Sequence, residues 1–528
     1  MIGHSELGQT MLTALQRLGE QTFRALRLDR PVHTPVDRAF RLAARYWPVA
    51  LLAIWALLYL PILGDRPLRF EEGRRAAQAM AILFDGDWWR LDIGGQPYTA
   101  KPPLLPWLMA LVAMARGTVD EIAVRLPAIL AVLGGALSAG YAAHALTSAD
   151  DRRFAAFCAG IAFLCMPFIV TMGRIGETDT TATFLAGLAL MIWLVARTRG
   201  EVSVLAWIGV GAALAGAGFA KGPAPMVFSI VAIAAITIAS RKPREFAGLA
   251  LALAVSALPL LIWLWFNEGR TNAAHLADEM RLTVFDDLGA YALTLLRLGE
   301  IPIATLLLLP WIVPIALWLW RNRRDGNGWS WQVTSLLIAA VPVAIVILLW
   351  PESRERYAMP IVWPVAVLAG LAISGLWTRN RFAGVILVSG MIFAVIFQAV
   401  TFFAIEGKTH FQRERRDLVT NLSEATANAE GRILFLSPHR RPDFNIFAYA
   451  RHPMLQIRPE AVACPPEANL LVSEGPDRHL PQQSTLWSER ASLADGAILV
   501  FERTSAAPKA GACDMVPDPL VTPEFLAR

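Results

Sequence analysis

Eleven long apolar runs constrain this chain more than any other feature. An α-helix needs about 20 apolar residues to cross the hydrocarbon core of a bilayer, and only helices and closed barrels satisfy all their backbone polar groups there. Runs of this kind lie near residues 47–63, 123–147, 154–172, 179–198, 203–219, 224–240, 246–267, 301–320, 333–350, 357–377 and 382–404. The sequence therefore predicts a polytopic α-helical membrane protein with about eleven transmembrane helices.

The composition agrees with a membrane protein and argues against a nucleic-acid-binding one. Hydrophobic residues make up 55% of the chain and charged residues 17%, whereas soluble domains are about 25% charged. The 18 tryptophans also fit, because indole favours the membrane interface. The net charge is +5, but the arginines occur in short loops between apolar runs and form no basic patch that could bind nucleic acid.

Basic residues predict the orientation of the helices. With a cytoplasmic N-terminus, every loop on the inner side carries at least two cations, as the positive-inside rule requires. These cations are Arg152, Arg153, Arg197, Arg199, Arg241, Lys242, Arg244, Arg321, Arg323, Arg324, Arg379 and Arg381. The segment before Trp47 is polar and has no h-region, so we expect no cleaved leader and a first run that acts as an anchor.

The predicted chain has three parts. Residues 1–45 form a cytoplasmic N-terminal segment, and residues 46–405 form the transmembrane domain. This domain includes an outer loop, residues 64–122, in which the run 104–117 is too short to span and is expected to lie as a helix on the membrane surface. In the C-terminal region, residues 406–528, RILFLS, FNIFAYARH, LLVS and AILVFERT suggest strands alternating with helices, which predicts a small soluble α/β domain outside the cytoplasm.

The four cysteines fall into two pairs. Cys158 and Cys165 lie in an apolar run, where packing is the expected role. Cys464 and Cys513 lie in the C-terminal region. An oxidising compartment would allow a disulfide between them, but two cysteines do not decide whether they are bonded.

The outer loop and the helix ends on the same side carry a series of motifs. In the loop and just after it these are Glu71-Glu72-Gly73-Arg74, Gly86-Asp87-Trp88, Lys101-Pro102-Pro103-Leu104 and Ala123-Val124-Arg125-Leu126-Pro127. Further on they are Thr178-Asp179, Ala220-Lys221-Gly222-Pro223 and Arg356-Tyr357-Ala358-Met359-Pro360. Their order, spacing and sidedness resemble the ArnT/PMT-type glycosyltransferases over about residues 47–405. Those integral membrane GT-C enzymes take a sugar from a polyprenyl-phosphate carrier.

The resemblance implies three catalytic carboxylates. Glu71 aligns with the first acidic residue of the family pattern D-E-x-R and is the expected general base, with Glu72 as the alternative. Asp179 is expected to organise the acceptor or the cations of the outer loop. Plain roles stay open for all three, since the two glutamates would also solvate the end of the first span and Asp179 would also cap its helix.

Cations on the outer side are the predicted ligands of the leaving phosphate. Lys101 precedes two prolines, which hold a stiff turn. Lys221 lies between two apolar runs, where it either binds phosphate or extends to the lipid headgroups. The other expected substrate-binding residues are Arg74, Arg354, Arg356 and Tyr357, although Tyr357 fits a plain interface aromatic equally well.

The sequence predicts no metal site, while leaving room for a divalent cation. Ala100 stands where many similar sequences have a glutamate that could bind metal. His275, near Asp278 and Glu279, has no spaced histidine partner. No Gly-rich phosphate loop occurs, which argues against a nucleotide-sugar donor.

The resemblance implies a glycosyltransferase of a bacterial inner (plasma) membrane, with its active site facing the periplasm. It would move a sugar from a polyprenyl-phosphate carrier, with inversion, to an envelope acceptor: lipid A, another glycolipid or glycan, or a protein hydroxyl. The alternative is a flippase or transporter of a lipid-linked sugar, which would bind the same phosphate but needs no general base. Transporters also tend to have repeated halves, and no such internal symmetry is visible here.

Overall fold

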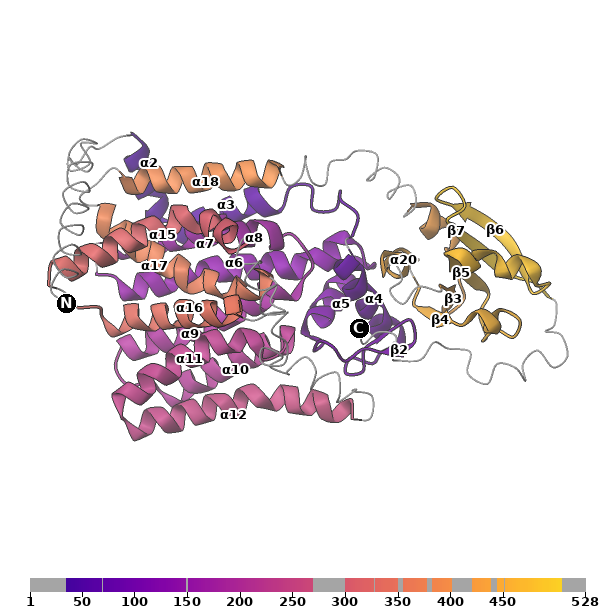
Figure 1. Cartoon of the computed structure of the whole chain (residues 1–528), viewed down its shortest axis with the longest axis horizontal. Helices are drawn as coiled ribbons and strands as arrows, with labels where there is room; N and C mark the ends of the chain where they lie inside the picture. Colours follow the sequence, from indigo (N-terminus) through magenta and orange to yellow (C-terminus); the bar gives the residue numbers. More distant parts are fainter. Residues whose placement is uncertain are drawn as a thin grey trace, which may run out of the picture.

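The computed structural model is a bundle of long helices with a mixed β-sheet at one end (Figure 1). It describes residues 35–68, 70–148, 151–268, 300–326, 328–349, 355–377, 382–400, 420–437, 444–450 and 452–505. Two elements of the outer loop, α4 (Phe70–Asp85) and α5 (Leu104–Arg116), lie between the bundle and the sheet in Figure 1. The fold is therefore mostly helical.

Each apolar run predicted from the sequence contains helix among its described residues. The helices are α3 (Trp47–Tyr59), α6 (Glu121–Leu146), α7 (Arg152–Cys165), α8 (Pro167–Met172), α9 (Thr178–Thr198), α10 (Val204–Lys221), α11 (Ala224–Ser240), α12 (Pro243–Phe266), α15 (Glu300–Arg324), α16 (Trp331–Leu349), the 3-10 helix η2 (Glu355–Ile361) continued by α17 (Val362–Trp377), and α18 (Phe382–Val400). A short helix, α2 (Pro35–Arg45), precedes α3.

Five helices within the described ranges are long and apolar enough to cross a membrane. They are α6, α9, α10, α12 and the η2–α17 segment, and α2 with α3 makes a sixth if this pair, bent by 108°, is one span. The count of about eleven transmembrane helices stays a prediction.

The predicted run 154–172 is broken into two helices. Met166, between α7 and α8, has an extended backbone with φ −68° and ψ 132°. Pro167 explains the break, because proline lacks an N–H group and disfavours helical geometry in the residue before it. The chain therefore reaches the turn before α9 through a short separate helix.

Small residues let the helices approach closely in the bundle core. A Cβ atom on Gly187 of α9 would lie 2.3 Å from the Trp363 ring of α17. The indole of Trp363 donates in turn to Ser138 Oγ of α6 at 2.9 Å. Such contacts are typical of membrane helices, where packing and buried hydrogen bonds replace the hydrophobic drive. They fix α9, whose N-terminus carries part of the site described below.

The outer loop contains more regular structure than the sequence suggested. Residues 70–85 form α4, with an alanine-rich buried face that includes Ala76 and Ala79, and alanine is the best helix former. A two-stranded ribbon follows, β1 (Asp92–Ile93) and β2 (Gln96–Pro97). The predicted run 104–117 forms α5, which is half-buried against its neighbours.

Five strands of the C-terminal region form one mixed sheet in the order β4-β3-β5-β7-β6. The strands are β3 (Ile433–Leu436), β4 (Met454–Ile457), β5 (Leu470–Glu474), β6 (Trp487–Leu493) and β7 (Ile498–Arg503). β3 is parallel to β4 and β5, and β7 is antiparallel to β5 and β6. Around the sheet lie the helix α20 (Phe444–Tyr449) and two 3-10 helices, η4 (Pro459–Val462) and η5 (Pro476–Gln483).

The sheet is docked on the outer loop through a shared hydrophobic core. Ala76, Ile93, Phe435 and Phe447 belong to this one cluster. Gly94 has a φ of +64°, and a Cβ atom there would meet the Phe447 ring at 3.2 Å. The backbone continues the contact, since Gln456 N–H donates to Gly94 O at 3.0 Å. The C-terminal sheet therefore holds the outer loop in place.

Tyr449 makes polar contacts in this interface and gives a first test of it. Its hydroxyl accepts from Leu68 N–H at 2.6 Å and donates to Glu121 Oε1 at 2.9 Å. Tyr449→Phe removes the acceptor of a buried N–H, which costs about 1–3 kcal/mol. We expect faster hydrogen–deuterium exchange in α4 and α20. Tyr141→Phe, at an exposed tyrosine bonded to Arg199, is the control, and equal exchange in both variants would contradict the role of Tyr449.

Candidate functional site

The first turn of α4 presents an accessible carboxylate flanked by two cations. Glu71 Oε2 lies 3.3 Å from Arg74 Nη1 and 3.9 Å from Arg75 Nη2. Both arginines follow Glu71 at the helical spacings i+3 and i+4, which place their side chains on one face. The Glu71 side chain is 29% exposed. Glu71 is thus reachable from outside and kept in an anion-stabilising environment.

Glu72 points the other way and is completely buried. Its carboxylate accepts two hydrogen bonds from Arg125 of α6, at 2.8 and 3.1 Å, and one from the backbone N–H of Gly176 at 3.0 Å. Burial alone would raise the pKa of Glu72, but the Arg125 and Arg66 charges and these hydrogen bonds hold the pKa below its ordinary value. Glu72 therefore joins α4, α6 and the turn before α9.

A second cluster forms where α9 begins, α10 ends and η2 passes. Lys221, the last residue of α10, donates to Asp179 Oδ1 in the first turn of α9. Its Nζ also lies 4.7 Å from the centre of the Tyr357 ring. The predicted residues Asp179, Lys221 and Tyr357 therefore meet, although they are far apart in the sequence. Lys101 and Arg356 interact electrostatically with Lys221 from the same surroundings.

Glu177 connects the two clusters and was not among the predicted site residues. It is 5% exposed, directly precedes α9, and interacts with Arg75 and Glu71 of α4 as well as with Asp179. Burial raises the pKa of Glu177 to about 7; the Arg75 charge opposes this rise, and the Asp179 and Glu71 charges add to it. This acid is therefore partly protonated near neutrality.

Arg75 was also missed by the sequence reasoning. It is 3% exposed, donates to Tyr98 OH at 3.1 Å and to Gln78 Oε1 at 3.4 Å, and its Nε atom is buried with no acceptor among the described residues. The sequence showed only that Arg75 follows Arg74. Which of two adjacent arginines is buried depends on the packing of α4.

The structure thus brings most predicted site residues to one end of the bundle. The predicted residues that surround Glu177 or its neighbours are Glu71, Arg74, Asp179, Lys221, Arg356 and Tyr357. Lys101 interacts with Lys221. Arg354 and His275 lie outside the described residues. Within the described part of the chain, no three histidine, cysteine, aspartate or glutamate side chains are grouped so as to hold a metal ion.

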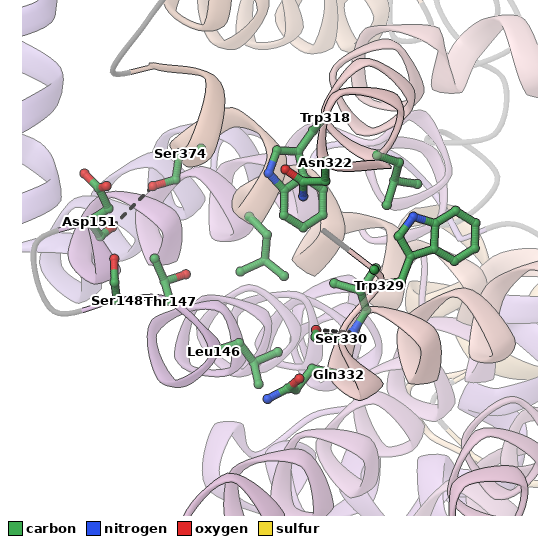
Figure 2. Close-up of a pocket in the computed structure, with 15 residues that line it drawn as sticks. Leu146, Thr147, Ser148, Asp151, Trp318, Asn322, Trp329, Ser330, Gln332 and Ser374 are labelled. Atoms are coloured by element: carbon green, nitrogen blue, oxygen red, sulfur yellow. Dashed lines mark hydrogen bonds between the residues drawn. The ribbon is translucent and has the colours of Figure 1, made fainter. Parts of the chain in front are cut away.

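A separate cavity of about 310 Å³ lies at the opposite end of the bundle, beside the C-terminal end of α6. α6 separates this end from the site, since its 26 residues span about 39 Å. In Figure 2, Ser374 Oγ donates to Asp151 O at 3.5 Å at its edge. The cavity is lined by Leu146, Thr147, Ser148, Asp151, Trp318, Leu319, Asn322, Gly328, Trp329, Ser330, Gln332, Val333, Leu371, Ser374 and Gly375. None of the predicted site residues contributes to it.

Known proteins resemble this chain in sequence and in fold. A family model described as dolichyl-phosphate-mannose-protein mannosyltransferase matches residues 100–263. The undecaprenyl phosphate-alpha-4-amino-4-deoxy-L-arabinose arabinosyl transferase of Pseudomonas aeruginosa is 27% identical over 353 residues, 62% of this chain and 59% of that protein. The crystal structure of ArnT from Cupriavidus metallidurans bound to undecaprenyl phosphate has a TM-score of 0.66 at 18% identity, covering 88% of this chain and 99% of that chain. The chain is therefore similar to the ArnT/PMT-type GT-C proteins in sequence and in fold.

The fold has a further relative among solved structures. The Archaeoglobus fulgidus oligosaccharyltransferase, in complex with Zn and sulfate, has a TM-score of 0.51 at 14% identity, covering 81% of this chain and 67% of that chain. At such identities the likeness shows the fold alone. The chain matches 59% of the length of the Pseudomonas aeruginosa protein, so the activity has to be argued from the site.

Proposed function

We propose that this ArnT/PMT-type protein is an inverting glycosyltransferase that moves a sugar from a polyprenyl phosphate to an envelope acceptor. The observation that carries the proposal is the accessible Glu71 carboxylate at the same end of the bundle as the cations of the Lys221 cluster. The relative named for undecaprenyl phosphate-linked aminoarabinose supports a lipid-phosphate donor. Lipid A, another glycolipid or glycan, and a protein hydroxyl are the acceptor classes.

In the proposed reaction, the acceptor hydroxyl oxygen attacks the anomeric carbon of the sugar while Glu71 takes the hydroxyl proton. The bond from the anomeric carbon to the phosphate oxygen breaks, and the electron pair leaves with the polyprenyl phosphate. Lys221, Lys101 and Arg356 stabilise the developing phosphate charge. Attack opposite the leaving group inverts the configuration at carbon. No step in this scheme requires a metal ion.

Glu71 is a better general base than Glu72 for a geometric reason. Both carboxylate oxygens of Glu72 already accept hydrogen bonds from Arg125, and the side chain is fully buried. A group in that position cannot reach an acceptor hydroxyl without breaking a buried ion pair. Asp179 is bonded to Lys221, and we assign it the role of positioning this lysine.

The proposed location is a bacterial inner membrane with the site on the periplasmic side. The basic residues of the inner loops support this orientation. Cys464 gives independent support, because it is disulfide-bonded and disulfides persist in oxidising compartments such as the periplasm. Cys513 lies outside the described residues, whereas Cys158 and Cys165 are free and buried. We further propose the division into segments 1–45, 46–405 and 406–528.

The test is sugar transfer by purified protein in lipid nanodiscs, with a panel of radiolabelled polyprenyl-phosphate sugars and envelope lipid extracts. Lys221→Ala is expected to lower kcat/KM about 100-fold, because it removes one preorganised charge at the phosphate. Lys242→Ala, which changes an exposed lysine of an inner loop, is the matched control and should keep the parent rate.

A flippase would give a different pattern in the same experiment. It would bind the lipid-linked sugar and carry it across the bilayer, with no labelled acceptor from any donor in the panel. Lys221→Ala would then reduce movement of the lipid, and Glu71→Gln would leave it unchanged. That combination would contradict the proposed transferase.

A further inference from the structure

Glu177 is a buried carboxyl group for which the proposed chemistry has no use. It faces Arg75 and Glu71 from α4, Asp179 from its own helix, and Arg356 from η2. Asp179 is in turn paired with Lys221. Glu177 therefore lies beside Arg356, which the proposed function assigns to phosphate binding, and beside the buried Arg75. A phosphate bound there would share these two guanidinium groups with Glu177.

The two arginines beside Glu177 each have a hydrogen-bond donor that lacks an acceptor among the described residues. The Nε atoms of Arg75 and Arg356 are both buried and have no acceptor among the described residues. A buried donor without an acceptor is costly, and a bound anionic group would satisfy these donors. A negative charge on Glu177 would compete with a phosphate for the same guanidinium groups.

We propose that Glu177 regulates the charge of the phosphate site, so that an anionic lipid phosphate binds tightly when Glu177 is protonated and weakly when it is ionised. This inference rests on the proposed function. It assigns a positioning role, because Glu177 acts on the phosphate through Arg75 and Arg356 and does not react with the sugar.

The direction of the effect follows from linkage. Burial already raises the pKa of Glu177 to about 7 in the empty site. A bound phosphate adds a negative charge nearby and raises this pKa further. Because the coupling is reciprocal, phosphate binding must weaken as the pH rises through the pKa of Glu177. One unit of pKa difference between the empty and occupied site corresponds to about a tenfold change in affinity.

The experiment measures binding of a non-transferable probe between pH 6 and pH 8. The probe is a C55 polyprenyl methyl phosphodiester, which stays singly charged over this range and carries no sugar to transfer. Full-length parent protein in nanodiscs is expected to bind it about three- to tenfold more weakly at pH 8 than at pH 6. Glu177→Gln, a neutral isostere, is expected to bind with the same affinity at both pH values, close to that of the parent at pH 6.

The matched control is Glu201→Gln, which removes an exposed carboxylate paired with Arg244 in an inner loop and should keep the pH dependence of the parent. The inference is overturned if Glu177→Gln titrates like the parent. It is also overturned if the parent protein binds the probe equally at both pH values or does not bind it. Either result is measured on the parent alone and does not depend on whether a variant folds. Sugar transfer is measured separately, so a failed transferase assay with pH-dependent binding would reject the proposed function and leave this inference intact.

Discussion

Replacing Glu71 with glutamine is expected to lower kcat for sugar transfer by about two to four orders of magnitude. Glutamine keeps the size of the side chain but cannot accept the proton of the acceptor hydroxyl. The partners Arg74 and Arg75 can still contact the amide oxygen, so donor binding should change little. The measurement is single-turnover transfer at saturating donor, with donor affinity measured in parallel.

Two companion variants sharpen this test. Glu71→Asp restores the residue type of the family pattern and should retain much more activity than Glu71→Gln, because the carboxylate remains and only its reach changes. Glu430→Gln, at an exposed glutamate of the C-terminal region, should match the parent. If Glu71→Gln transferred sugar at the parent rate, the base would have to be another carboxylate, with Asp179 the next candidate.

Replacing Glu72 with alanine is expected to destabilise the protein by about 3–5 kcal/mol, because it leaves Arg125 buried without its counter-charge. Arg125 would keep only the carbonyl groups of Leu63, Arg66 and Pro67 as acceptors. Since the pKa of Glu72 is held below its ordinary value by the Arg125 and Arg66 charges, the stabilisation is present at neutral pH and is lost as the pH falls through that lowered pKa. The measurement is the folded fraction after heating in detergent, at pH 7 and at acidic pH.

The neighbouring glutamate on the same helix is the natural control. Glu71→Ala removes a half-exposed carboxylate, and exposed ion pairs contribute about 0–1 kcal/mol, so its folded fraction should remain close to that of the parent. The double variant Glu72→Gln with Arg125→Met removes both charges and should be less destabilised than Glu72→Ala. Equal stability of Glu72→Ala and Glu71→Ala would show that the buried pair has no structural role.

The comparison of Glu71 with Glu72 illustrates what sequence reasoning could reach at the site. Two adjacent acids in one motif are equivalent in the sequence, and the resemblance could only rank them. Neighbouring residues on a helix point about 100° apart, so one of the pair faces outward to Arg74 while the other is buried against Arg125. Arg125 was visible in its motif, but its partner lies 53 residues away.

Glu177 was missed for a related reason. Its signal in the sequence was only its position two residues before Asp179, and an acid in that place would usually be solvated. Its neighbours include Arg75 and Glu71 of α4, and α4 was itself expected as part of a loop. The contacts of the C-terminal region with the outer loop, Gln456 with Gly94 and Tyr449 with Leu68, were likewise not predictable, because no local pattern encodes a contact between distant segments.

The sequence by itself determined the helical membrane character of the chain and the set of charged residues near one end of the helices, because hydropathy and charge bias act locally. The break before Pro167 was not predicted, since residues 154–172 were predicted as one apolar run. Only the tertiary structure decided which of these charges are paired, buried or accessible. Lys221 meets Asp179 and Tyr357, and Glu177 meets Arg75, through the packing of helices that are remote in sequence. Such contacts arise because burying an ionisable group requires a partner, and the partner is selected by the fold as a whole.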